Sequence, residues 1–481
     1  MTILLSIAVY FVLLVAISRR AARKADNATF FSGERRSPWM MVAFGMIGAS
    51  ISGISLVSVP GMVLHSQMTY LQLCIGFVFG YLVVAFVLLP VYYRLGLTSI
   101  YAYLGQRLGR PSYATGAWIF IISKLSGAAV KFYVVCLLLH QFVFSHHGVP
   151  FWLTVAGLVT LIWAYTRRGG VRSLVFTDTF QTLCLFGALF FILFSVLHTM
   201  QLDWSSAMQT VWSDTRSRVF VMDDWHSSQY FWKQLVSGIF IVVVMTGLDQ
   251  DMMQKNLTCR TLREAQKDMC SYGVAFVPAN LLLLVIGLLL AIHYESLSAA
   301  MPSADQLITT YVHGQGTALM VLFSIGIVAA SFSSADSALT SLTTSFCIDI
   351  AQKRADERLR HTAHLVFCLL FAGFILVFHA LNSTSLIDAI YIMVSYTYGP
   401  LLGLFAFGLL TSRRLPTLPH AIGGRLIPVV CIASPVVCRL LDVTVANVLG
   451  YRFGYELLLL NGMLTFCGLW AISLLHPQTK E

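Results

Sequence analysis

The chain has 481 residues, of which 57% are hydrophobic and 11% are charged, and its mean hydropathy is +0.78. This composition excludes a soluble fold and is typical of a polytopic membrane protein. The net charge of +10 comes from basic residues gathered in alternate loops, so it indicates the orientation of the chain and no nucleic-acid partner.

Apolar runs of about 17 to 25 residues, the length of a helix that crosses a bilayer, recur from end to end. They predict an all-α protein with thirteen spans in a single transmembrane domain, residues 1–481. The expected spans are residues 2–18, 39–63, 69–92, 114–143, 151–166, 172–198, 230–249, 270–293, 318–346, 362–380, 385–411, 421–440 and 455–475.

The first span is followed by "RRAARK" and by no small-residue cleavage site, so it is interpreted as a retained anchor. Basic loops such as "TRRGGVR", "QKNLTCRTLREAQK" and "QKRADERLR" are expected on the cytoplasmic side. The N-terminus would then lie outside and, after thirteen crossings, the C-terminus inside, in the cytoplasmic membrane.

Ten cysteines are scattered singly, without the spacing of a metal site, and no phosphate-cradling loop is present. We therefore expect no cofactor and no use of ATP as the energy source. The chain is not expected to be an enzyme.

Two spans are interrupted by residues that break helices. Residues 45–61, "GMIGASISGISLVSVPG", place glycines, serines and a proline in the second span, and the seventh span breaks near Gly247. A broken helix early in each of two five-helix halves is the pattern of an inverted-repeat secondary transporter, whose sites lie at the unwound points. The expected parts are a leading segment 1–24, a ten-helix core 38–411 and two further helices in 420–475.

Six hydroxyls and one carboxylate lie within "AASFSSADSALTS", residues 329–341 of the ninth span. Ala330, Ser333 and Ser334 stand at i, i+3 and i+4, on one face of a helix, so one carbonyl and two hydroxyls can meet at one point. Oxygen ligands of this kind, with carbonyls from "GASISG", would suit a sodium ion. The alternative is that these serines bond their own i−4 carbonyls or allow close helix packing.

Two acidic residues in the spans are candidates for a second cation or coupling site, because charge in a membrane is costly unless it is paired or wetted. Asp178 could hold a cation or a proton, or it could cap the helix entrance near Arg172. Asp336 points about 200° away from Ser334 on a helix, so we expect it, with Ser337, beside the sodium site and not in it.

Lys124 and Lys131 lie seven residues apart on one face of the fourth span. They could form an anion site for a carboxylate-bearing substrate, or a structural ion pair with Asp178, Asp336 or Asp388. Tyr391, in the eleventh span, is a further candidate for the cavity wall.

Five motifs occur in the order of one known family: "GASISGISLVSVPG", "GGVRSLVFTDTFQ", "GLDQDMMQKNL", "AASFSSADSALTSLTTSFCIDI" and "YTYGPLLG". In these the chain resembles the sodium:solute symporter family over nearly its whole length. The resemblance implies a LeuT-type core with one helix before it and two after it, and sodium-driven symport of a small solute.

The resemblance also implies site residues. Sodium would be held by the carbonyls of Gly48, Ile51 and Ala330 and by the hydroxyls of Ser333 and Ser334, and Asp178 corresponds to an aspartate of a further sodium site or of coupling in some members. The substrate would meet Ser50, Ser52 and Ser55 and the charge of Lys124 or Lys131; Gln72 and Tyr391 are further candidates for the substrate site. Because "IFIVVVMT" lacks the side chains that bind sugar hydroxyls, a small organic acid such as a sialic acid is preferred to a sugar.

Three other functions stay open. Coupling could be to protons through Asp178 or Asp336, or the protein could be a transporter-like solute sensor. An intramembrane hydrolase on Ser334 and Asp336 would need a base, and no histidine is near in sequence. The expected partners are the solute, Na⁺ and the lipid bilayer, in a monomer or weak homo-oligomer.

Overall fold

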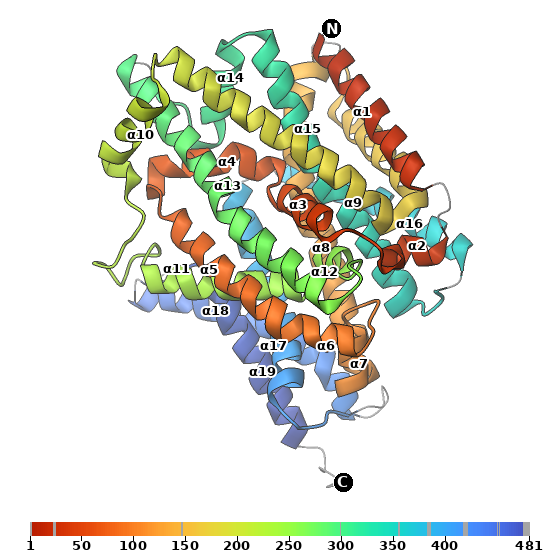
Figure 1. The fold of residues 1–481 in the computed structure, drawn as a ribbon. Coiled ribbons are helices and arrows are strands. Elements are labelled where there is room, and N and C mark those ends of the chain that lie inside the picture. The colour runs from red at the N-terminus through yellow and green to blue at the C-terminus, as the bar shows by residue number, and fades with distance from the viewer. Residues whose placement is uncertain are drawn as a thin grey trace.

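The computed structural model describes residues 2–22, 26–145, 148–298, 300–354, 356–381, 386–416, 422–449, 451 and 453–474. Every regular element in these ranges is a helix, as predicted (Figure 1). The longer helices are α1 (Thr2–Ala21), α3 (Trp39–Ser50), α4 (Gly53–Ser66), α5 (Tyr70–Val83), α8 (Arg110–Leu139), α9 (Phe151–Thr199), α11 (Phe231–Val242), α13 (Leu262–Ser296), α15 (Thr317–Ser345), α16 (Glu357–Leu381), α17 (Leu386–Leu410), α18 (Ile422–Leu449) and α19 (Leu457–Leu474). The shorter ones are α2 (Asn27–Ser32), α6 (Leu89–Arg94), α7 (Ala102–Leu108), α10 (Trp204–Ser213), α12 (Gln250–Asn256) and α14 (Leu307–Gly314).

Within the described ranges, nine helices are long and apolar enough to cross a membrane, or up to eleven if each of two bent pairs is one span. Two shorter apolar helices, Phe151–Arg167 and Tyr396–Leu410, coincide with two further expected spans. The count of thirteen therefore stays a prediction, while the polytopic helical architecture is confirmed.

The first bent pair is α3 and α4, which meet at 63° around Ile51 and Ser52. The Ser52 N–H donates to the Ser50 carbonyl at 3.0 Å, whereas in a continuous helix it would bond Gly48. The break thus releases carbonyl groups from the helical ladder in the middle of the protein, where the sequence predicts an unwound segment.

The second bent pair is α11, extended by the turn η6 (Val243–Gly247), and α12, which meet at 70°. The carbonyls at this break have partners: Tyr92 donates its hydroxyl to Gly247 at 2.9 Å and Tyr101 donates to Leu248 at 3.0 Å. Such bonds replace the water that a membrane cannot supply.

The fifth and sixth expected spans are joined in the single element α9. The joint is Gly170, whose φ of 51° is a left-handed conformation that glycine adopts without a Cβ clash. A Cβ at this position would also collide with the backbone of Phe30. The kink therefore requires glycine both for its backbone conformation and for its lack of a side chain.

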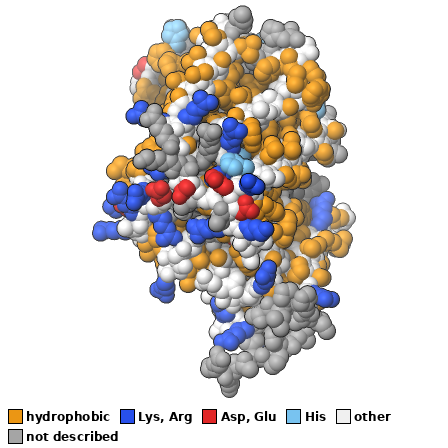
Figure 2. All heavy atoms as spheres, turned by 90° about the vertical axis from the view of Figure 1, so that its right-hand side faces the viewer, with side chains coloured by type: hydrophobic (Ala, Val, Ile, Leu, Met, Phe, Trp, Pro, Cys, Tyr) orange, Lys and Arg blue, Asp and Glu red, His pale blue; other side chains and the backbone are white. Residues whose placement is uncertain are grey.

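α15 lies at the centre of the molecule and packs against α9 and α8, and α17, α18 and α19 pack together at one edge (Figure 1). Large apolar side chains are exposed on the outer helices, among them Leu5 and Val12 of α1 and Leu369 of α16. Figure 2 shows a broad hydrophobic surface on this side of the molecule, with charged side chains gathered in a band across the middle of the view. This is the distribution expected of a protein surrounded by lipid.

Candidate functional site

The break between α3 and α4 lies against the serine-rich part of α15. The Ser334 hydroxyl lies 2.7 Å from the Ala49 carbonyl and 3.2 Å from the Ala330 carbonyl. Two of the predicted sodium ligands, Ser334 and Ala330, therefore meet a backbone oxygen of the unwound segment at one point.

The carbonyls of Gly48 and Ile51, the other backbone ligands expected, accept no backbone N–H bond in the described structure. The amide that would serve Gly48 in a continuous helix, that of Ser52, bonds Ser50, and the first bond of α4 at this end runs from Leu56 to Ser52. Three carbonyls within residues 48–51, those of Gly48, Ala49 and Ile51, are thus left outside the backbone ladder. Neutral oxygens with no backbone donor are a suitable donor set for a hard monovalent cation.

Ser333 serves a different partner. Its hydroxyl donates to Asp178 Oδ1 of α9 at 2.7 Å, and the other carboxylate oxygen of Asp178 lies 2.8 Å from the ammonium of Lys255. The side chains of Asp178 and Lys255 are only 1% and 2% exposed. Asp178 therefore takes part in a buried ion pair and does not simply cap a helix entrance.

Sequence reasoning missed Lys255, which it assigned to a cytoplasmic basic loop. The structure places it in α12, the second half of the broken seventh span, with its ammonium inside the protein. The available signal was its position, eight residues after Gly247 at the expected break, because a helix that restarts there carries Lys255 back into the bundle.

Asp336 lies beside this pair without joining it. The Tyr165 hydroxyl donates to one of its oxygens at 2.7 Å, and the Ser337 hydroxyl lies 3.4 Å from the other. Its side chain is fully buried. The structure brings Asp336 and Ser337 together, away from Ser334, as the helical geometry predicts.

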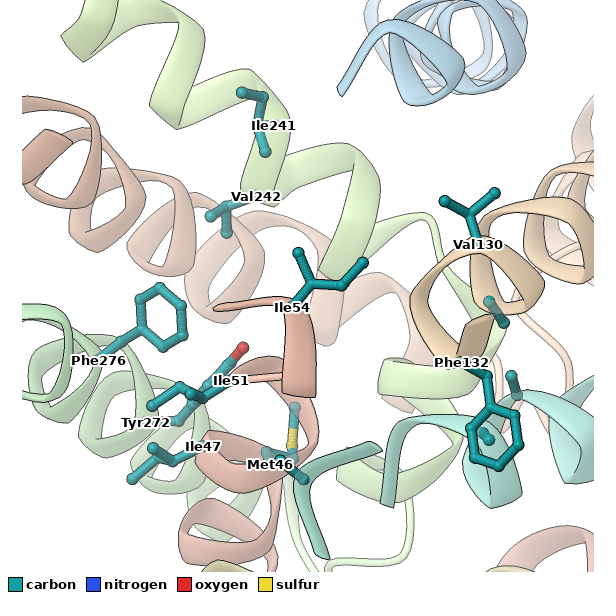
Figure 3. Packing of buried hydrophobic residues seen from close by; sticks show 14 of the residues in the cluster. Met46, Ile47, Ile51, Ile54, Val130, Phe132, Ile241, Val242, Tyr272 and Phe276 are labelled. Atoms are coloured by element: carbon teal, nitrogen blue, oxygen red, sulfur yellow. The ribbon is translucent and has the colours of Figure 1, made fainter. Parts of the chain in front are cut away.

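A cavity opens on the other side of the break, between α4, α5, α8, α11 and α13. Its polar lining includes three of the expected substrate residues, Ser50, Ser52 and Ser55, together with Thr246 and Lys131. Its apolar lining includes Ile54, Phe77, Val242 and Phe276; Figure 3 shows Ile54, Val242 and Phe276 around one space. The hydroxyl groups of Ser50 and Tyr272 are hydrogen-bonded at its wall.

The two lysines of α8, Lys124 and Lys131, differ in whether a carboxylate lies beside the ammonium group. The Lys124 ammonium lies 3.1 Å from Asp249 and 2.7 Å from Asp251, and Asp249 also accepts a hydrogen bond of 2.8 Å from Tyr398. The ion pair expected as one alternative is therefore present at Lys124, with acids on either side of the α12 start and not with Asp178 or Asp336.

Lys131 lines both this cavity and a smaller one that continues toward Lys124 and Asp249. In the described part of the chain, no carboxylate oxygen lies within 4.0 Å of its ammonium. Lys131 is thus the lysine of α8 that faces open space.

Gln72, which was also expected to contact the substrate, does not lie at the cavity. Its side chain is fully buried, its amide donates to the Gln229 carbonyl at 2.9 Å, and its oxygen accepts from the Val221 N–H at 3.0 Å. It fastens the loop before α11 and does not line the cavity. Tyr391 and Asp388 belong to α17, but their side chains lie outside the described residues.

Two solved structures resemble this fold. A Na⁺-coupled sialic acid symporter in a substrate-bound outward-open state matches with a TM-score of 0.83 at 17% identity, over 100% of this chain and 99% of its own. A nucleobase-cation-symport-1 family transporter in a closed conformation matches with a TM-score of 0.59 at 13% identity, over 95% of this chain and 97% of its own. These likenesses confirm the LeuT-type fold.

One curated relative is the Homo sapiens sodium/iodide cotransporter, which is 27% identical over 52% of this chain and 38% of its own length. Another is the Oryctolagus cuniculus sodium-dependent multivitamin transporter, which is 27% identical over 82% of this chain and 63% of its own length. The chain thus spans less than two thirds of the length of either relative. The model of the sodium:solute symporter family matches residues 30–416. With this match over most of the described helices, the chain belongs to the sodium:solute symporter family.

Proposed function

We propose that this protein is a sodium-coupled symporter that imports a small organic anion by alternating access. The observation that carries the choice of substrate class is Lys131, a basic residue that lines the cavity between the two helix breaks. The family and the fold support the transport activity.

The three lysines around the site have different surroundings. Lys124 and Lys255 each lie within 3 Å of a carboxylate oxygen, at 2.7 and 2.8 Å. Lys131 has no such partner among the described residues and borders the cavity. A cation deep in a membrane protein is costly unless it is paired or wetted, so a carboxylate on the solute would complete the charge balance.

The remaining wall suits an organic acid and not a bare ion. Ser52, Ser55 and Thr246 present hydroxyls for polar groups of the solute, while Phe77 and Phe276 present apolar surface for its carbon skeleton. The solved relative is named for sialic acid, and Homo sapiens and Mus musculus relatives are named sodium-coupled monocarboxylate transporters. A sialic acid is therefore the first solute to test.

Sodium binding would connect the two halves of the fold. The oxygens of Ala49 and Ser334 already lie within 2.7 Å of one another, so an ion held there would bind the α3–α4 break to α15. An ion that stabilises this arrangement favours the state that binds substrate. A membrane potential of 100 mV adds about 2.3 kcal/mol per inward charge, before the concentration gradient is counted.

The proposal includes the topology expected from the basic loops. The chain would form one transporter domain in the cytoplasmic membrane with its N-terminus outside and its C-terminus inside. The core would be residues 38–411, after the leading segment 1–24 and before the two helices within 420–475. It would act as a monomer or weak homo-oligomer.

The test is uptake of radiolabelled N-acetylneuraminic acid and of a short monocarboxylate into proteoliposomes, with an inward sodium gradient or an equal potassium gradient at constant pH. We expect uptake only with sodium. Equal uptake in both salts, with a response to pH instead, would replace sodium by protons as the coupling ion.

The variant Lys131→Met tests the substrate class. Loss of a buried partner of a charged ligand costs about 2 kcal/mol or more, so the KM for the acid should rise at least about thirtyfold. Lys131→Arg should retain uptake, and Lys353→Met, on an exposed loop, is the control. An unchanged KM in Lys131→Met would refute the anion assignment.

A further inference from the structure

We infer that the ammonium of Lys255 occupies the second cation site, at Asp178, so that the protein binds one sodium ion and not two. This inference rests on the proposed sodium coupling and concerns its stoichiometry. It follows from the arrangement of α9, α12 and α15 around Asp178.

The site has the groups that a cation would need. The Asp178 carboxylate is 1% exposed, lies beside the serine-rich segment of α15 and accepts the Ser333 hydroxyl at 2.7 Å. Ser333 is adjacent in sequence to Ser334, the residue that meets the Ala49 carbonyl. The Asp178 carboxylate and the Ser333 hydroxyl are thus oxygen groups of the kind that a second cation would need, on the residue next to a proposed ligand of the first ion.

Lys255 fills this centre with a charge that belongs to the chain. Its nitrogen lies 2.8 Å from Asp178 Oδ2, and its side chain is 2% exposed. Both carboxylate oxygens of Asp178 are therefore engaged, one by a hydroxyl and one by an ammonium. A sodium ion at this point would have to displace one of them.

The helix above the site leaves little room for an additional ion. Gly45 of α3 faces Asp178 so closely that a Cβ on it would lie 3.0 Å from Asp178 Cβ, and Gly48 faces Thr182 in the same way. The Thr182 hydroxyl is itself bonded to the Asp178 carbonyl at 2.6 Å. The α3–α9 contact thus closes this side of the pair.

Removal of the ammonium should reopen the site. Breaking a buried ion pair on one side leaves an uncompensated charge, which attracts a replacement cation. In Lys255→Ala, the shortened side chain leaves both the space and the negative charge of Asp178. In the double variant Asp178→Asn with Lys255→Ala, the space remains but the charge is gone.

The experiment is equilibrium binding of radiolabelled sodium to the purified full-length protein. We expect one ion per molecule for the unaltered chain and for Lys255→Arg, two for Lys255→Ala, and one for the double variant. Two ions on the unaltered chain would overturn the inference, as would a single ion on folded Lys255→Ala.

Two ions on the unaltered chain would overturn the inference even if Lys255→Ala does not fold. The outcome for the proposed function is separate. If the unaltered chain binds no sodium and Lys255→Ala binds one ion, sodium coupling is wrong while the role of Lys255 stands.

Discussion

At the scale of single residues, the proposed sodium site is tested most directly by substitution of Ser334. Its hydroxyl lies 2.7 Å from the Ala49 carbonyl, where the proposed ion would sit. In Ser334→Ala, one oxygen ligand is lost; hydrogen bonds to charged groups contribute about 1.5–3 kcal/mol, and a loss of that size weakens sodium binding about tenfold to a hundredfold. The measurement is the sodium concentration that gives half of the rise in melting temperature of the purified protein.

Ser324 provides the matched control on the same helix. Among the described residues, its hydroxyl bonds only the Met320 carbonyl one turn before it, at 2.7 Å. Ser324→Ala should therefore leave the sodium response unchanged. If both variants respond to sodium as the unaltered chain does, Ser334 is not a ligand.

Some of these contacts could be predicted from the sequence and others could not. Helical spacing alone brings Ala330 and Ser334 to one face of α15, and the structure brings them to the unwound segment. Spacing cannot show that the Ser333 hydroxyl turns to Asp178, because this contact joins residues 155 positions apart. Lys255 was missed for a related reason: a basic residue at the end of a span resembles a loop charge until the bend of α12 is known.

At the scale of helices, the close packing of α13 against α4 holds the second half of the broken span. Gly287 of α13 faces the backbone of Pro60, and a Cβ there would collide with the Pro60 carbonyl. In Gly287→Ala the backbones must separate, and overpacking of this kind costs about 1–3 kcal/mol. Thermal unfolding in detergent, followed by size-exclusion chromatography, should show a lower melting temperature.

Gly187→Ala is the control, since Gly187 also lies within a long membrane helix but faces open space. It should be neutral or slightly stabilising, because alanine favours helix over glycine. If Gly287→Ala is as stable as Gly187→Ala, the α13–α4 contact does not hold α4 in place.

Both helix breaks were predictable from helix-breaking residues, because glycine and serine cluster in "GASISG", residues 48–53, and Gly247 lies at the second break. The groups that hydrogen-bond the free carbonyls at the second break could not be predicted from the sequence. Tyr92 and Tyr101, which bond the carbonyls of the second break, come from a segment about 150 residues earlier. Similarly, Gln72 is a polar residue in a span, which made it a candidate for the cavity, but only the three-dimensional structure shows that it bonds Val221 and Gln229.

At the scale of the whole molecule, we expect the proposed alternating access to separate the end of α15 from its neighbours. Asp349, in the turn η8 (Phe346–Ile350) after α15, accepts hydrogen bonds from Ser99 at 2.8 Å, Ser345 at 2.6 Å and Tyr113 at 2.9 Å. This one carboxylate joins α15 to α8 and to the segment before α7. We expect it to act as a latch that opens when the molecule changes state.

Asp349→Asn tests this latch by removing the charge while keeping the shape. The neutral side chain keeps one acceptor oxygen in place of two and loses the charge that strengthens these bonds, so the open state should gain at least about 1.4 kcal/mol, a tenfold change in population. Cys347, two residues away, is fully buried and reports the opening by its rate of reaction with N-ethylmaleimide, followed by peptide mass spectrometry. The exposed Cys467 serves as the internal reference, and its rate should not change. Sodium would hold α3 and α15 together, so it should slow the reaction of Cys347 in the unaltered chain. If the rate depends on neither the substitution nor sodium, this end of α15 does not move during transport.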